Sequence, residues 1–216
     1  NALLFGTHHP NGEFETEETI GNVTLQDVKN NYASYFVPEK AYLIVVGDVE
    51  FDKVKKSVEK LFSGWKKASA PKQEYPVTKN VAKTQIDFVD MPNAVQSEIA
   101  LVNAVEIRMT DKDYFASVMA NQILGGGGEG RLFLNLREDK GWTYGSYSSV
   151  GAGKYTSKFK STASVRNTVT DSAVVEIMKE INKIRTQPVN EDELKLAKAK
   201  FVGNFVMETQ KPGTIA

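Results

Sequence analysis

Two side chains, Arg137 and Tyr144, combine residue types and a spacing that could support hydrolytic chemistry. An arginine guanidinium offers five hydrogen-bond donors in a fixed arrangement, and a tyrosine hydroxyl offers one more. Placed together, they could hold a peptide carbonyl and stabilise the oxyanion that develops when water attacks it. The residues alone also allow a solvated helix end for Arg137, which precedes Glu138 and Asp139, and a half-buried strand position for Tyr144.

The metal ligands that a hydrolase would need are scarce in this chain. Its only histidines are the neighbours His8 and His9, and it has no cysteine. A catalytic zinc needs about three protein ligands, and the side chains of adjacent residues point in different directions. Neither H-E-x-x-H nor its inverse H-x-x-E-H occurs. We therefore predict that the chain itself binds no catalytic zinc and needs no other cofactor.

Four consecutive glycines follow Leu124. With Gly130 they match the dinucleotide pattern G-x-G-x-x-G, but that pattern must follow a strand, and residues 115–124 are predicted to be helical. A phosphate-binding P-loop is excluded because Arg131 and Leu132 come where lysine and serine or threonine are required. The run is either a helix cap with a flexible turn or a mobile loop beside an extended peptide. The second interpretation gives four candidate substrate-binding residues: Gly125, Gly126, Gly127 and Gly128.

The first third of the chain shows helix and strand signals. Thr24 and Asp27 stand in capping-box positions at the start of a helical pattern. The apolar run Tyr42–Val46 predicts a buried strand, and the apolar residues of 51–62 recur at helical spacing. Residues 67–83 are rich in lysine, alanine, serine and proline, which predicts a linker between domains.

After this linker, strands follow one another and helices gather in separate runs. Such an order is typical of an α+β fold, with an antiparallel or mixed sheet covered by helices on one face. We expect strands at 85–89, 97–105, 143–150 and 155–165, and helices at 111–124, at 171–185 and from a cap at Asn190.

Composition narrows the possible partners. Twenty-seven basic residues balance twenty-seven acidic ones, so net charge gives no reason to expect nucleic acid. No run of eighteen apolar residues exists, and no membrane span is predicted. We expect a fragment truncated at both ends. A periplasmic or cytoplasmic setting in bacteria fits the sequence, as does a mitochondrial one.

Three motifs occur together: HHPNG near the start, AYLIVVGDV, and LGGGGEGRLFLNLREDKGWTYGSYSS at 124–149. In this order they resemble the non-metal half of pitrilysin/insulinase-type zinc peptidases, which include mitochondrial processing peptidases and bacterial relatives. The resemblance runs from about Leu4 to the end. It implies the LuxS and processing-peptidase type of fold, with a mainly antiparallel sheet flanked by helices. It also implies that Arg137 and Tyr144 project into an active chamber.

The same resemblance implies a division of labour. Residues 1–66 would close a first, metal-type domain, and residues 84–216 would form most of a second, non-metal domain that binds substrate. Zinc would sit in the complete enzyme or a partner subunit, on an H-x-x-E-H motif. The chain would then help to cleave peptides or unfolded polypeptides and would be inactive alone. Two alternatives stay open: a non-catalytic partner subunit of such a peptidase, and a peptide- or protein-binding module without catalytic role.

Overall fold

The computed structural model describes residues 1–72 and 74–216; residue 73, in the predicted linker, lies outside them. The chain divides into two compact units, the first formed by Asn1–Glu13 and Tyr75–Phe201, the second by Phe14–Glu74 and Val202–Ala216. The described residues of 67–83 form neither helix nor strand. The assignment of 1–66 and 84–216 to two domains of a peptidase stays a prediction.

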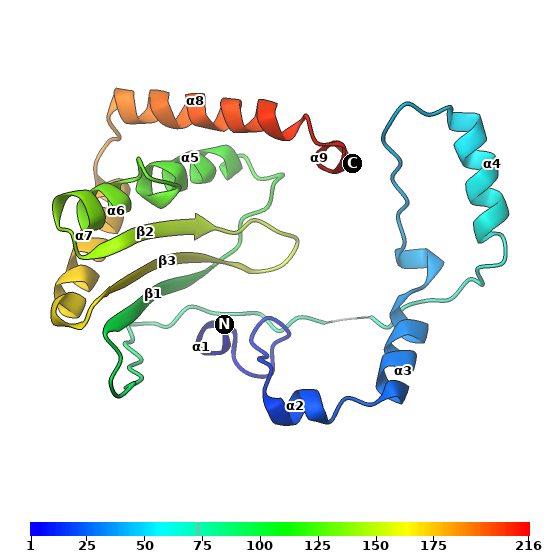
Figure 1. Cartoon of the computed structure of the whole chain (residues 1–216), viewed down its shortest axis with the longest axis horizontal. Coiled ribbons are helices and arrows are strands. Elements are labelled where there is room, and N and C mark those ends of the chain that lie inside the picture. Colours follow the sequence, from blue (N-terminus) through cyan, green and yellow to red (C-terminus); the bar gives the residue numbers. More distant parts are fainter. Residues whose placement is uncertain (73) are drawn as a thin grey trace. The chain divides into compact units, whose positions relative to one another are not determined.

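The first unit is built on a three-stranded antiparallel sheet (Figure 1). Its strands are β1 (Gln96–Val105), β2 (Thr143–Val150) and β3 (Ser157–Arg166), in the order β1-β3-β2. β3 is central, and it pairs with β1 from Gln96↔Arg166 to Val105↔Ser157 without interruption. The predicted strands at 97–105, 143–150 and 155–165 are confirmed to within two residues.

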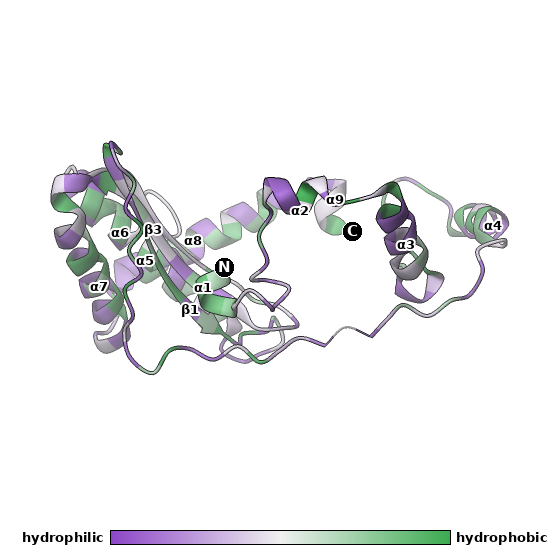
Figure 2. Ribbon diagram, turned by 90° about the horizontal axis from the view of Figure 1, so that it is seen from below, coloured by the Kyte–Doolittle hydropathy of each residue, from purple (hydrophilic) through white to green (hydrophobic). Residues whose placement is uncertain are grey.

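Helices pack on one face of this sheet. They are α5 (Tyr114–Gly125), α6 (Arg131–Phe133), the π-helical η2 (Leu134–Asp139) and α7 (Thr170–Thr186), which follows η3 (Asn167–Val169). α8 (Glu191–Glu208) belongs to this unit up to Phe201. The core between helices and sheet is apolar, and α7 alternates hydrophobic and hydrophilic positions as an amphipathic helix does (Figure 2). The buried residues of this core are Ile99, Leu124, Leu132, Leu136, Ala163, Val165, Ala173 and Ile177. The α+β prediction is thereby confirmed.

The remaining elements are short helices. α1 (Ala2–Phe5) belongs to the first unit, and the second contains α2 (Glu17–Gly21), α3 (Leu25–Tyr35), η1 (Pro38–Lys40), α4 (Phe51–Phe62) and α9 (Pro212–Ile215). The predicted capping box begins α3: the Asp27 N–H donates to Oγ1 of Thr24 at 3.2 Å, and the Thr24 N–H donates to Oδ2 of Asp27 at 2.9 Å. None of the described helices has the length and hydrophobicity needed to cross a bilayer.

Two predicted strands are wrong. Residues 42–46 and 85–89 belong to no strand, and Tyr42 and Ile86 are 92% and 84% exposed. Both runs are rich in β-branched and aromatic residues. These residue types favour strands because their side chains pack well on the surface of a sheet, and not because they fix an extended backbone by themselves. Within the described residues neither segment has a neighbouring strand to supply that surface.

Candidate functional site

Arg137 lies in the last turn of η2. In this wide turn the Lys140 N–H donates to the carbonyl of Asn135 at 3.0 Å, five residues earlier. Leu136 is fully buried in the core, while the Arg137 side chain is 44% exposed. Such π-helical turns are frequent at functional sites because they change which side chains face outward.

An aromatic pair holds the Arg137 guanidinium. Its central carbon lies 5.0 Å from the centre of the Phe133 ring, within the range of a cation–π contact. The Phe133 ring in turn lies 5.8 Å from the ring of Tyr147 on β2. Nη1 of Arg137 also forms an ion pair with Glu138. The guanidinium is therefore tied through two rings to the strand that carries Tyr144.

Tyr144 is the second residue of β2, and 90% of it is exposed. The turn before it depends on Gly141, whose φ of 62° lies in the left-handed region that favours glycine. The Trp142 N–H then donates to the carbonyl of Leu136 at 3.0 Å and closes η2 against the start of β2. Arg137 and Tyr144 thus stand on consecutive elements, although no hydrogen bond joins them in the part of the chain that the structure describes.

The glycine run is shaped by close packing rather than by left-handed backbone. None of the four glycines has a positive φ. A β-carbon on Gly125 would lie 2.5 Å from the backbone nitrogen of Ser148, and one on Gly130 would lie 2.9 Å from Cα of Gly125. A β-carbon on Gly128 would meet nothing closer than a ring atom of Phe133, at 3.8 Å. Gly125 and Gly130 let the backbone pack, while a β-carbon on Gly128 would make only an ordinary van der Waals contact with the Phe133 ring.

Two ion pairs connect the glycine loop and α6 to α8. Arg131 donates to both carboxylate oxygens of Glu193, from Nε at 2.8 Å and Nη2 at 2.7 Å. These hydrogen bonds lower the pKa of Glu193 and raise that of Arg131, against the opposing effect of burial. Lys200 pairs with Glu129 in the loop itself and lowers the pKa of that carboxyl. The loop is therefore tethered at its end.

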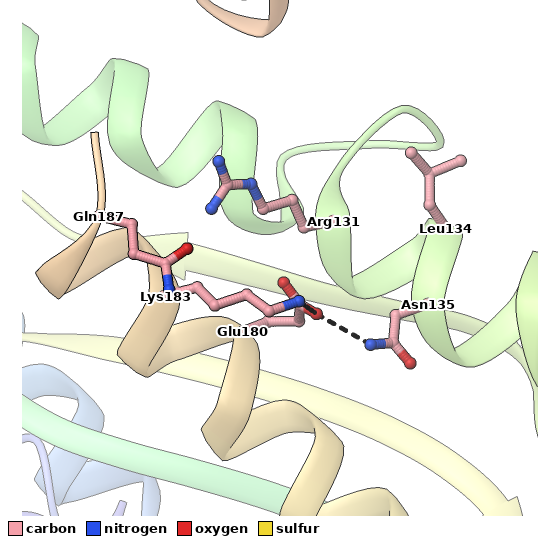
Figure 3. A pocket seen from close by; sticks show the side chains of 6 residues that line it. All are labelled: Arg131, Leu134, Asn135, Glu180, Lys183 and Gln187. Carbon is pink, nitrogen blue, oxygen red and sulfur yellow. Dashed lines mark hydrogen bonds and ion pairs between the residues drawn. The ribbon is translucent and has the colours of Figure 1, made fainter. Parts of the chain in front are cut away.

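A polar pocket of about 390 Å³ opens beside these pairs (Figure 3). Its side chains come from α6, η2, α7 and the residue that follows α7: Arg131, Leu134, Asn135, Glu180, Lys183 and Gln187. The buried Glu180 accepts from Asn135 at 2.9 Å and from Lys183 at 2.7 Å, and Arg131 is committed to Glu193. Its charged groups thus already have partners, Glu180 and Lys183 within the pocket and Arg131 outside it, which favours a structural role for the pocket.

The histidines do not fit a zinc site. His9 is buried between the rings of Phe5 and Tyr75, and its Nδ1 accepts from the Asn11 N–H at 3.0 Å, whereas His8 is exposed. Across residues 1–72 and 74–216, no three histidine, cysteine, aspartate or glutamate side chains gather to hold a metal ion. The zinc that the sequence resemblance implies for a complete enzyme therefore finds no ligand set among these residues.

Comparison with known proteins places this chain in a family. Residues 22–201 match the family described as the peptidase M16 inactive domain. The chain belongs to this family. The resemblance to the non-metal half of zinc metallopeptidases is thereby confirmed, and with it the inactive-domain character of this M16 chain.

Several relatives of the M16 chain are bacterial proteins. A probable inactive metalloprotease of Bacillus subtilis, YmfF, is 24% identical over 201 residues, which cover 93% of this chain and 45% of the relative. An uncharacterised zinc protease of Rickettsia felis is 27% identical over 196 residues, covering 90% and 46%. A crystal structure of a peptidase M16 inactive domain from Pseudomonas fluorescens matches with a TM-score of 0.83 at 24% identity, over 94% of this chain and 48% of that one. The M16 chain thus spans about half the length of its relatives.

Sequence reasoning missed two residues of the site, Phe133 and Tyr147. The four-residue spacing of Phe133 and Arg137 on a helical segment could have revealed their contact. Nothing in the sequence pattern indicates the ring contact between Phe133 and Tyr147, which depends on how η2 meets β2.

Proposed function

We propose that this M16 domain is the substrate-binding, non-metal region of a zinc endopeptidase that cleaves peptides or unfolded polypeptides in an enclosed chamber. The observation that carries the proposal is the joint exposure of Arg137 and Tyr144 on the adjoining elements η2 and β2. The metal-bearing H-x-x-E-H domain, in the same polypeptide or in a partner subunit, would supply the attacking water.

The donors available at Arg137 and Tyr144 suit a developing oxyanion. Nη1 of Arg137 contacts Glu138, and its other N–H groups have no partner among the described residues. The Tyr144 side chain is exposed almost completely. Donors fixed before the reaction stabilise the oxyanion without having to reorganise. Phe133 contributes by holding the guanidinium over its ring.

The edge of β2 offers a place for an extended peptide. In the described part of the sheet, β2 pairs on one side only, with β3. Backbone groups on a free strand edge can pair with an added strand, which binds peptide with broad tolerance of its sequence. Of the four candidate glycines, Gly128 is the one where a β-carbon would crowd no neighbouring atom, so it is the position we expect nearest to such a peptide.

The test uses the complete polypeptide together with its metal-bearing domain or subunit. Arg137→Ala and Tyr144→Phe are expected to lower turnover of an unfolded polypeptide by about 10² to 10³, as the loss of an oxyanion donor does. Matched controls are Arg185→Ala, at the exposed end of α7, and Tyr155→Phe, on the β2–β3 connection. Both controls should retain wild-type turnover.

The outcome separates the proposal from its rivals. Wild-type turnover in Arg137→Ala and in Tyr144→Phe would contradict the assignment. Loss of peptide affinity with no catalysis in any assembly would indicate a binding module instead. The full reading frame decides between the remaining two: an H-x-x-E-H motif in the same chain indicates a single-chain enzyme, and its co-purification on another chain indicates a partner subunit.

A further inference from the structure

The pairing of β2 with β3 is interrupted beside Tyr144. Thr143 is opposite Val165 and Ser146 is opposite Ala163, so two β2 residues, Tyr144 and Gly145, face the single β3 residue between these partners. This is a β-bulge. Bulges disrupt the ladder locally and re-aim side chains, and they are common next to active sites.

The bulge determines which way Tyr144 points. Ser146 is fully buried on the helix-covered face, and strict alternation counted back from it would put residue 144 on that face too. The extra residue breaks the alternation, and Tyr144 is 90% exposed. Gly145 shares its side of the sheet with Tyr147, because a β-carbon on Gly145 would lie 2.6 Å from the Tyr147 ring. Without the bulge, Tyr144 would be directed at the core beneath α5.

One hydroxyl joins the interrupted ladder. Oγ1 of Thr143 accepts from the Gly145 N–H at 3.1 Å. It lies 2.6 Å from the carbonyl oxygen of Ser164 and 2.9 Å from that of Gly145, so its proton can be donated to either. The hydroxyl thus provides hydrogen-bond partners for backbone groups of both β2 and β3 where the regular pairing between these strands is interrupted.

We infer that Thr143 is the positioning residue of this site: its hydroxyl holds the bulge that presents Tyr144 to substrate. The expected effect of Thr143 on turnover rests on the proposed function, whereas its stabilisation of the bulge does not. A methyl group in place of the hydroxyl would leave the Gly145 N–H without its acceptor and the Ser164 carbonyl without its donor. Tyr144 would then lose its fixed place, and a displacement of about 1 Å at a catalytic group costs about 100-fold in rate.

The experiment compares Thr143→Val, which keeps the β-branched shape, with Thr143→Ser, which keeps the hydroxyl, in the complete protein. Amide hydrogen exchange at Gly145 should accelerate about 5- to 10-fold in Thr143→Val, the equivalent of one neutral hydrogen bond. The kcat should fall about 10- to 100-fold with KM little changed. Thr143→Ser should restore both. Thr162→Val, in the regular part of β3, should change neither.

Each outcome has one meaning. Unchanged exchange at Gly145 in Thr143→Val overturns the inference, whatever happens to turnover. The inference is also overturned if Thr143→Val accelerates exchange at Gly145 but keeps full kcat, while Tyr144→Phe has lost activity. Accelerated exchange with full kcat in both Thr143→Val and Tyr144→Phe supports the hold on the bulge and overturns the proposed role of Tyr144. If Thr143→Val does not fold, Thr143→Ala removes the same hydroxyl with less bulk, and the same readings apply.

Discussion

The carboxylate of Glu193 receives two hydrogen bonds from the Arg131 guanidinium, at 2.8 and 2.7 Å, across 62 residues of sequence. The pair joins the first turn of α8 to the start of α6, directly after the glycine loop. Its side chains are 16% and 35% exposed, so solvent screens it less than it would a surface pair. Its two-pronged geometry is the strong form of arginine–carboxylate contact.

A double-mutant cycle on Arg131→Met and Glu193→Gln should give a coupling energy of about 1 to 3 kcal/mol in urea unfolding. The exposed pair Lys53–Glu50, with side chains 77% and 70% exposed, is the matched control and should couple by less than about 1 kcal/mol. Equal coupling in the two pairs would show that Arg131–Glu193 is an ordinary surface contact.

The same pair predicts how stability depends on pH. The pKa of Glu193 is held below its ordinary value of 4.5, chiefly by the hydrogen bonds from Arg131. A lowered carboxyl pKa adds stability that is fully present above the unfolded value and is lost as pH falls through the folded one. The unfolding free energy should therefore decrease as the pH drops below about 4.5, and it should decrease less in Glu193→Gln. Parallel pH profiles for wild type and variant would contradict this.

The glycine loop gives a prediction with an internal control. Gly125→Ala places a β-carbon 2.5 Å from the Ser148 backbone, which can move only by shifting β2. We expect a loss of about 1 to 3 kcal/mol in unfolding free energy, as for other overpacked sites. Gly128→Ala meets nothing closer than 3.8 Å and should change stability by less than about 1 kcal/mol, in the stabilising direction. Similar losses in both variants would mean that the loop tolerates no side chain anywhere.

The Asn80 side chain covers part of the outer edge of β1, at Ala104. Nδ2 of Asn80 donates to the carbonyl of Ala104 at 2.9 Å, and the Ala104 N–H donates to Oδ1 of Asn80 at 2.7 Å, as a neighbouring strand would. Asn80→Ala should cost about 1 to 3 kcal/mol for the two bonds and should promote concentration-dependent association through the opened edge. Sedimentation velocity checks this, with Lys79→Ala as the control. A monomeric Asn80→Ala at all concentrations would contradict the edge-blocking role.

Local signals predicted local structure well in this chain. The bounds of β2 and α4 and the capping box at Thr24 follow from periodicity and side-chain chemistry within a few residues. The exposed run at 42–46 shows where such signals fail, because a strand also needs a partner that lies elsewhere in the chain.

The site shows the same limit. Arg137 and Tyr144 could be selected from residue type and resemblance, but the bulge that exposes Tyr144 depends on the register with β3. A shift of one residue in that register exchanges the two faces of the sheet, and neither strand's sequence shows it alone.

The contact between Phe133 and Arg137 leads to a prediction about how the guanidinium is held. Phe133→Leu keeps an apolar side chain but removes the ring face, so a cation–π contribution of about 0.5 to 1 kcal/mol should be lost. The Arg137 side chain should become more mobile, which the ¹⁵N relaxation of its Nε–H can measure in the complete protein. Turnover should fall about two- to fivefold, the rate equivalent of about 0.5 to 1 kcal/mol in transition-state stabilisation.

Phe115→Leu is the matched control, since its exposed ring lies on α5 against Tyr114 and Phe201 and has no contact with Arg137. It should leave both the relaxation of Arg137 and the turnover unchanged. If Arg137 is equally ordered in Phe133→Leu, the ion pair with Glu138 must hold the guanidinium instead. In that case Glu138→Gln, rather than Phe133→Leu, would release the side chain, and the aromatic pair would only pack η2 against β2.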